Sequence, residues 1–388
     1  MNKCSSIFGQ ILQLFSRPEF YGAVRDLRAE RGAKGFSCWD QFVAMLFCQV
    51  GQAHSLREIS GGLASCLGKL KHLGVDKAPC RSTLSYANEH RPWQLYEAVF
   101  YQLLQKCQAL AKGRTKFRFR NKLFSLDATV IELCASLFDW AKFRTTKGAV
   151  KLHLLLDHEG YLPVFAHITE GAVHEVNVAR RLAFAKGSIV VIDRGYADYA
   201  LFGRWTREEV YFVTRLKGNA AYRVVSERPV PANRNILRDQ AIELTGFYSR
   251  RKCPHVLRRI EVWDKDTEQV IVLLSNHHEF GATTIASTYK DRWQIETFFK
   301  TIKQNLRIKT FVGTSANALM IQIWTALIAI LVLKYLKFRS RFAWSLSNLV
   351  AMLRYNLFTY RDLWVWIDNP YETPPIVPDV EQLSLGGV

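Results

Sequence analysis

The hydrophobic period of the chain changes at about residue 123, and this change decides the fold class. Before it, apolar residues recur at helical spacing, as in FGQILQLF and WDQFVAMLFCQVG. After it, five runs indicate strands: LFSLDATVIELC, VKLHLLLD, LPVFAHITEG, SIVVIDRGYAD and VYFVTRLKG. HEVNVARRLAFA, between the third and fourth runs, indicates a helix. Three adjacent strands favour an antiparallel meander, and the later alternation favours parallel additions, so we expect an α/β core.

The 388 residues suit two or three domains, and we divide them into six segments. These are a helical N-terminal domain (1–111), a basic linker (112–122), the first part of the core (123–219), a β-rich insertion (220–285), the second part of the core (286–345), and a C-terminal helical segment with a tail (346–388). The insertion is predicted from its prolines and from two strand-like runs, RRIEVWD and QVIVLLSN.

The most apolar segment, ALMIQIWTALIAILVL at 318–333, is slightly short for a bilayer span and contains Gln322 and Thr325. We therefore expect a buried core helix and no membrane association. The N-terminus has no signal-peptide pattern, and the eight cysteines are scattered without a C-x-x-C pair. Reduced thiols in a cytoplasmic protein are the simplest interpretation.

The charge balance points to a polyanion, because 53 Lys and Arg stand against 34 Asp and Glu. The linker KGRTKFRFRNK alternates charge with Phe117 and Phe119; its charges are Arg114, Lys116, Arg118, Arg120 and Lys122. An extended segment would place these charges on one face, either tracking phosphates or simply solvated. The short N-terminal helices equally suit a helix-turn-helix-like DNA-binding domain or a helical packing domain.

Residues 289–303, YKDRWQIETFFKTIK, predict an amphipathic helix. One stripe carries Tyr289, Arg292, Glu296, Lys300, Lys303 and Arg307, with Trp293 on its flank. The apolar face carries Ile295, Phe298, Phe299, Ile302 and Leu306. The charged stripe is either a solvated face with helical salt bridges or a basic, aromatic surface around a single acid that meets an anion.

Two acids in apolar strand settings decide between these alternatives: Asp127 in FSLDATV and Asp193 at the end of SIVVID. Buried aspartates are rare unless they are paired or bind a metal. With Glu296 they form three acids that need a counter-charge, which a pair of Mg²⁺ or Mn²⁺ ions supplies through oxygen ligands. Such a pair activates the attacking oxygen and stabilises the leaving one in phosphodiester chemistry.

These residues resemble the DDE transposases of bacterial insertion sequences, in the subgroup with a Tyr-x2-Arg-x3-Glu-x6-Lys signature. Tyr289, Arg292, Glu296 and Lys303 meet every spacing, and Asp193-Arg194-Gly195-Tyr196 resembles the second-Asp motif. Asp127 stands where the first Asp is expected, and KGAVKLH (147–153) is also typical. His174-Glu175 departs from the usual His-Asp.

The resemblance implies an RNase H-like catalytic core, interrupted by the β-rich insertion and preceded by an all-helical DNA-binding domain. It implies a catalytic and metal-binding triad of Asp127, Asp193 and Glu296 with two Mg²⁺ ions, Mn²⁺ being a substitute. It also implies cut-and-paste transposition by a homodimer that binds the element's terminal repeats and target DNA, in the bacterial cytoplasm and at the nucleoid. The predicted DNA-contacting residues are Tyr289, Arg292, Trp293, Lys300, Lys303, Arg114, Lys116, Arg118 and Arg120.

Two other functions remain open at this point. A metal-dependent nuclease would cut DNA without joining it, and a catalytically decayed copy would bind DNA as a repressor. The full signature and all three carboxylates argue against gross decay.

Overall fold

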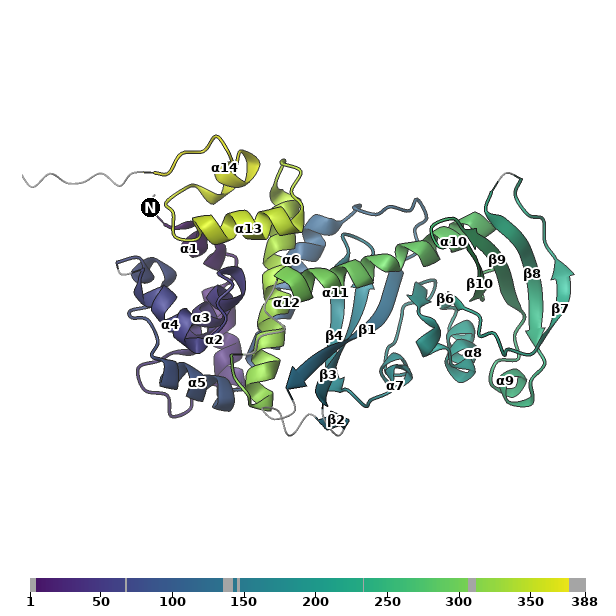
Figure 1. Ribbon diagram of the computed structural model, residues 1–388, viewed down its shortest axis with the longest axis horizontal. Coiled ribbons are helices and arrows are strands. Elements are labelled where there is room, and N and C mark those ends of the chain that lie inside the picture. The colour runs from purple at the N-terminus through teal and green to yellow at the C-terminus, as the bar shows by residue number, and fades with distance from the viewer. Residues whose placement is uncertain are drawn as a thin grey trace, which may run out of the picture. The chain divides into compact units, whose positions relative to one another are not determined.

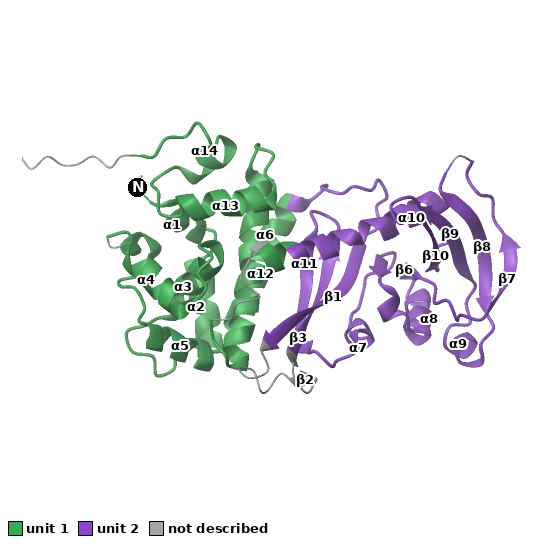
Figure 2. Ribbon diagram, viewed as in Figure 1, with its two compact units in different colours: residues 1–110, 301–388 green, residues 111–300 purple. Residues whose placement is uncertain are grey.

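The computed structural model describes residues 5–66, 68–134, 142–144, 147–232, 234–305 and 312–376. The chain divides into two compact units, which Figure 2 draws in different colours. Unit 1 combines Met1–Leu110 with Thr301–Val388, and unit 2 is Ala111–Lys300. The ends of the chain thus fold together, although almost two hundred residues of unit 2 separate them in sequence.

Unit 1 is helical in its described part, as the sequence predicts (Figure 1). Its elements are α1 (Ile7–Leu12), α2 (Arg17–Asp26), α3 (Cys38–Val50), α4 (Leu56–Ala64), the 3₁₀ helix η1 (Leu70–Leu73), α5 (Arg81–His90), α6 (Gln94–Ala111), α12 (Ala316–Arg339), α13 (Leu346–Asn356) and α14 (Leu363–Asp368). Local sequence determines where several of these helices begin. Ser37 and Asp40 form a reciprocal capping box on α3, and Ser55 caps α4.

Helix α12 is the core of unit 1 and contains the apolar segment 318–333. By length and composition it is long enough to cross a membrane, but most of it is buried inside the protein. It packs against α3, α5 and α13, and Trp324 is 1% exposed. The prediction of a buried core helix is therefore confirmed, because neighbouring helices cover the apolar surface that a bilayer would otherwise cover.

The sheet of unit 2 has the predicted mixed order. Its first strands are β1 (Leu123–Cys134), β2 (Lys142–Arg144), β3 (Lys147–Asp157), β4 (Leu162–Glu170), β5 (Ile189–Ile192) and β6 (Tyr211–Arg215). β3 pairs antiparallel with both β1 and β4, whereas β5 pairs parallel with β1 and β6. The antiparallel meander with parallel additions is confirmed, and it is the RNase H-like α/β core.

The insertion extends this same sheet (Figure 1). β10 (Gln269–Ser275) pairs antiparallel with β6, and β9 (Leu257–Asp264), β8 (Ile236–Leu244) and β7 (Tyr222–Glu227) follow in that order. The sequence indicated β9 and β10 only. β7 is exposed over most of its length, and β8 buries a charged residue, Asp239, which Arg258 of β9 binds through two hydrogen bonds of 2.8 and 2.6 Å. Neither strand therefore shows a clear apolar alternation.

Helices cover both faces of the sheet. On one face, α7 (Glu175–Ala179) and α8 (Tyr199–Arg207) contribute to a core that includes Ile192, Phe202 and Trp205, and α9 (Phe247–Lys252) contacts α8 and β8. On the other, α10 (Ala282–Asp291) packs through Ile285 and Tyr289 on Leu123 and Val191.

The helix predicted in HEVNVARRLAFA is shorter than expected, because α7 ends at Ala179. The side chain of Arg204 in α8 donates hydrogen bonds to the carbonyl oxygens of Arg180 and Leu182, at 2.7 and 3.2 Å. These tertiary bonds take the place of the helical ones beyond Ala179.

Candidate active site

Two neighbouring parallel strands bring Asp127, within β1, and Asp193, just after the end of β5, close together. Leu126 of β1 lies opposite Ile192 of β5, so the two aspartates follow this pair directly. Leu123 and Val191 belong to the core under α10, and the period of two places Asp127 and Asp193 on that same face. The sequence pattern and the pairing register together explain why both carboxylates lie on the face of the sheet that α10 covers.

The helix predicted over 289–303 is interrupted at Arg292, which corrects the expectation of one continuous helix. α10 ends at Asp291, and α11 (Trp293–Asn305) begins immediately after Arg292. Asp291 and Arg292, the two residues at this junction, are buried. The side chain of Asp291 binds His158, and the side chain of Arg292 binds Asp127 of β1. Tertiary bonds thus outweigh the helical preference of the local sequence.

Arg292 joins two of the three predicted acids. Its Nη1 lies 3.0 Å from Oδ2 of Asp127, and its Nη2 lies 2.8 Å from Oε1 of Glu296. The side chain of Arg292 is 10% exposed, that of Asp127 18% and that of Glu296 34%. The guanidinium carbon also lies 5.7 Å from the ring centroid of Tyr289. A cation on this helix junction therefore already supplies the counter-charge that the gathered acids require.

Asp127 is electrostatically strained in this setting. Burial, and to a smaller extent the negative charges of Asp193 and Glu296, raise its pKa to about 6. The backbone N–H of Ala128, 2.8 Å from Oδ1, and the charge of Arg292 lower the pKa but do not outweigh burial. The influence of Asp193 and Glu296 on Asp127 shows that the three predicted acids are gathered in one region of unit 2.

This pKa predicts a pH-dependent stability. Because the folded pKa of Asp127 lies above its ordinary value of 3.8, the folded state binds more protons than the unfolded state between about pH 4 and pH 6. The free energy of unfolding of the metal-free protein should fall by roughly 2 kcal/mol from this group as pH rises through that window. Denaturant titrations of the wild type and Asp127→Asn test it, and equal pH dependence in the two proteins contradicts it.

The predicted site residues did not include Glu175, which lies near the turn after Asp193, or its partner Lys151. Asp193 accepts a hydrogen bond from the backbone of Gly195 at 3.5 Å, and a Cβ at position 195 would lie 3.2 Å from Oε2 of Glu175. Glycine thus permits the carboxylate of Glu175 to approach this turn. Lys151 of β3 lies 3.2 Å from Oε1 of Glu175 and neutralises it. The His174-Glu175 pair and the typical segment 147–153 were the signals that could have indicated them.

The predicted DNA-contacting residues differ in exposure. Tyr289 and Arg292 are buried in this structure, at 7% and 8% exposed, whereas Trp293 is 62% exposed and Lys300 is exposed. Lys303 lies further along α11 and is half-buried. Arg307, which the same stripe includes, lies outside the described residues.

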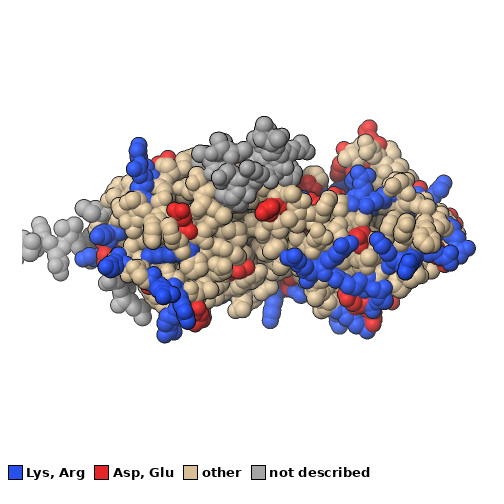
Figure 3. Space-filling view, turned by 90° about the horizontal axis from the view of Figure 1, so that it is seen from below, with Lys and Arg blue, Asp and Glu red and all other residues tan. Residues whose placement is uncertain are grey.

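The basic linker alternates as predicted, although it is not a strand. Phe117 and Phe119 stack with ring centroids 5.2 Å apart and pack on the core under α10. The basic side chains are exposed: Arg114, Lys116, Arg118, Arg120 and Lys122. In the view of Figure 3, which is from below Figure 1, unit 2 also carries many Lys and Arg side chains, with some Asp and Glu side chains among them. A basic surface on the catalytic unit suits a polyanion.

The donor chemistry of the acids fits a hard divalent cation, because each ligand is a carboxylate oxygen. The buried hydroxyl of Tyr196, whose pKa is raised by burial and by the charges of Asp127, Glu175 and Asp193, has no hydrogen-bond partner among the described residues. In the described part of the chain, no three His, Cys, Asp or Glu side chains stand together in metal-binding geometry. The guanidinium of Arg292 lies between two of the acids, so a bound cation would have to replace its bonds to them.

Comparisons with known proteins identify the family of the chain. The family model described as the transposase DDE domain matches residues 118–332, and a domain of unknown function matches residues 3–76. A putative transposase, y4zB, of Sinorhizobium fredii is 30% identical over 78% of this chain and 83% of its own length. A probable transposase for insertion sequence element IS5377 of Geobacillus stearothermophilus is 27% identical over 66% of this chain and 67% of its own length.

A third relative is a putative transposase for insertion sequence element IS4SA of Synechocystis, 24% identical over 66% of this chain. The DDE family model spans more than half of the chain and includes Asp127, Asp193 and Glu296. Members of this family act on DNA and use divalent metal ions. The chain belongs to the DDE transposase family and is a transposase enzyme of the kind that insertion sequences encode.

Proposed function

We propose that Asp127, Asp193 and Glu296 are the catalytic carboxylates and hold two Mg²⁺ ions, for which Mn²⁺ can substitute. The enzyme cleaves DNA at the ends of its element and joins the freed 3′-OH to target DNA, which is cut-and-paste transposition. The observation that carries this proposal is the bridge from Arg292 to Asp127 and Glu296, because it brings an acid of β1 and an acid of α11 to one cation.

The protein's own residues would act in a defined order. The carboxylates hold the ions, which, when bound, supply positive charge and activate the attacking oxygen. Arg292 gives up its bonds to Asp127 and Glu296 and turns to a phosphate of the DNA, where a guanidinium forms two parallel hydrogen bonds. Tyr289, Lys300 and Lys303 contact neighbouring phosphates.

The DNA path extends along the exposed basic linker, through Arg114, Lys116, Arg118 and Arg120. Exposed cations that alternate with partly buried rings suit a phosphate backbone, because the rings fix the segment while the charges face outward. The helical segment 1–111 binds the terminal repeats, and a homodimer brings two element ends together. The reaction takes place in the cytoplasm, at the nucleoid.

Trp293 is the residue that we assign to an unpaired base near the cleaved end. Its indole is 62% exposed, beside the buried Arg292. Trp293→Ala should weaken binding to end DNA that has an unpaired terminal base by tenfold or more, since stacking contributes about 1–3 kcal/mol per base. Binding to fully paired end DNA should change little.

Gel-shift titrations with the two DNAs test this assignment, and Tyr355→Ala is the control because Tyr355 is an even more exposed aromatic residue, at 77%. Equal losses on paired and unpaired DNA, or no loss on either, contradict a stacking role for Trp293.

A strand-transfer assay separates this function from its alternatives. A DNA duplex with the element's end sequence and a free 3′-OH is incubated with a supercoiled plasmid and Mg²⁺. A transposase yields end–plasmid joint molecules, a nuclease yields cut ends only, and a decayed repressor yields a stable complex without cleavage. Joint molecules that form equally well with an unrelated end sequence would contradict recognition of the element's own ends.

A further inference from the structure

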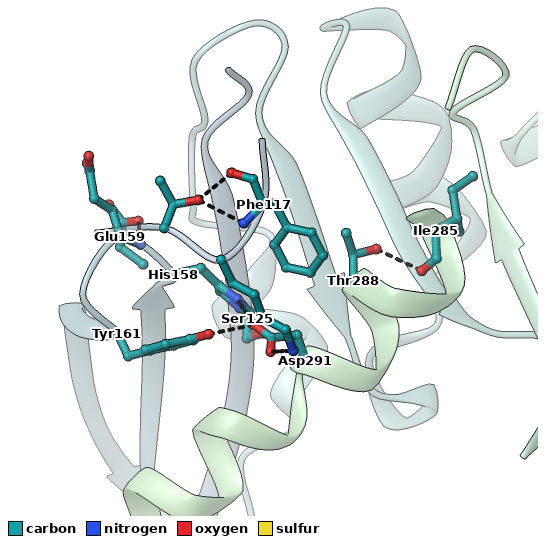
Figure 4. Close-up of polar contacts among 11 residues, drawn as sticks. Phe117, Ser125, His158, Glu159, Tyr161, Ile285, Thr288 and Asp291 are labelled. Carbon is teal, nitrogen blue, oxygen red and sulfur yellow. Dashed lines mark hydrogen bonds and ion pairs between the residues drawn. The ribbon is translucent and has the colours of Figure 1, made fainter. Parts of the chain in front are cut away.

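A buried polar network meets at Asp291, the last residue of α10 (Figure 4). Oδ2 of Asp291 lies 2.7 Å from Nδ1 of His158 and 3.0 Å from the hydroxyl of Tyr161. Oδ1 accepts a hydrogen bond from Nζ of Lys116 at 2.8 Å. On the far side of the imidazole, Nε2 lies 2.7 Å from Oγ of Ser125 in β1. A carboxylate only accepts, so Nδ1 of His158 donates to Asp291, and in the neutral imidazole Nε2 then accepts from Ser125.

The order serine, histidine, aspartate is that of a hydrolytic triad, but it has no access to substrate. Ser125 is 0% exposed, Asp291 2% and His158 3%. A nucleophile must reach a reacting atom, and the side chain of Ser125 is enclosed. The network therefore has a structural role within the protein and does not act on a substrate. Burial opposes ionisation of Asp291, but the hydrogen bonds from His158 and Lys116 hold its pKa below the ordinary value.

This network lies next to the three acids in sequence, both on β1 and at the junction of α10 and α11. Ser125 and Asp127 lie two residues apart on the same face of β1, and Asp291 and Arg292 are consecutive at the junction of α10 and α11. Two parallel links thus join β1 to the helix junction. The first is Ser125–His158–Asp291, and the second is Asp127–Arg292, which continues to Glu296.

A bound metal would affect the two links differently. A divalent cation held by Asp127 and Glu296 would compete with Arg292 for these carboxylates. No atom of the Ser125–His158–Asp291 link is shared with the three acids. When the second link opens, the first still fixes the start of α11, and with it the position of Glu296 one turn later.

We propose that Asp291, His158 and Ser125 are positioning residues that keep Glu296 beside Asp127 while Arg292 exchanges its carboxylate partners for metal. This inference rests on the proposed function of the acids. In metalloenzymes, residues that hydrogen-bond to the metal ligands orient those ligands, and the metal binds more weakly without them. The inference gives this buried network the same role.

The test compares Asp291→Asn and His158→Ala with Thr288→Val. Thr288 is 1% exposed and donates a hydrogen bond to the carbonyl of Ile285, within α10 alone, as Figure 4 also shows. The control therefore removes a buried hydrogen bond one turn before Asp291 without touching the link to β1. Mn²⁺ is titrated into each folded variant in complex with element-end DNA. Free Mn²⁺ is measured by electron paramagnetic resonance, and the Mn²⁺ concentration for half-maximal cleavage is measured in parallel.

Asp291→Asn and His158→Ala should raise both Mn²⁺ concentrations by about tenfold or more, the usual effect of losing a residue behind a ligand. Thr288→Val should leave both unchanged, whatever stability it loses. If the two network variants bind Mn²⁺ like Thr288→Val, the positioning role is overturned while the proposed function stands. A wild type whose cleavage does not depend on metal overturns the proposed function instead.

Discussion

The Asp193→Ala variant is expected to bind element-end DNA as the wild type does and to lose its metal-dependent cleavage. Asp193 follows β5 beside Asp127, and within the described residues its side chain accepts one weak bond, from the backbone of Gly195 at 3.5 Å. Its removal therefore costs the fold little. The loss of one ligand should slow cleavage by about a thousandfold or more, because metal catalysis contributes several kcal/mol to stabilising the transition state.

Asp198→Ala is the matched control for this experiment. Asp198 lies five residues later, caps α8 through the backbone N–H of Leu201 at 2.8 Å, and pairs with Arg180. The control should lose about 1 kcal/mol of stability and keep its cleavage rate. Cleavage rates come from single-turnover gels and binding from gel shifts on the same DNA. Cleavage that survives in Asp193→Ala removes Asp193 from the catalytic site.

The Arg292→Ala variant should lose about 3 kcal/mol of stability without metal, because it leaves Asp127 and Glu296 partly buried without a counter-charge. Millimolar Mn²⁺ should then return much of the lost stability, since the cation no longer competes with a guanidinium. The wild type should gain less from the same Mn²⁺. Denaturant titrations with and without Mn²⁺ measure both effects.

Arg259→Ala serves as the control for metal rescue. Arg259 is 8% exposed, as is Arg292, and it pairs with Glu261 and Gln240 in the insertion. Its replacement should also destabilise the protein, but Mn²⁺ should not restore that loss. Equal recovery of the two variants, or none in Arg292→Ala, means that metal does not take the place of Arg292.

The antiparallel meander with its parallel additions and the faces that carry the acids could be predicted because local signals determine them. The period of two in LFSLDATV and the apolar run before Asp193 specify which face each aspartate occupies. The helical stripe likewise placed Glu296 opposite a buried apolar face that includes Ile295 and Phe298, and both are buried. The resemblance to the transposase family then joined residues that the sequence separates widely.

The break at Arg292 and the network at Asp291 could not be predicted in the same way. In sequence, Asp291 is one more polar residue in an amphipathic helix, and His158 and Tyr161 belong to a turn between strands. Their roles arise from contacts across 133 and 130 residues of chain. β7 and β8 were missed for a related reason, since their stabilising partners are a neighbouring strand and a buried ion pair rather than an apolar face.

The central claim is that Asp127, Asp193 and Glu296 share divalent metal. Anomalous diffraction from crystals of the wild-type complex with end DNA, grown with Mn²⁺, tests this claim most directly. The account predicts anomalous peaks within bonding distance of carboxylate oxygens of all three residues, with the guanidinium of Arg292 no longer bonded to Asp127 and Glu296. Ordered Mn²⁺ bound elsewhere, with Arg292 still bridging the two acids in an active complex, would contradict it.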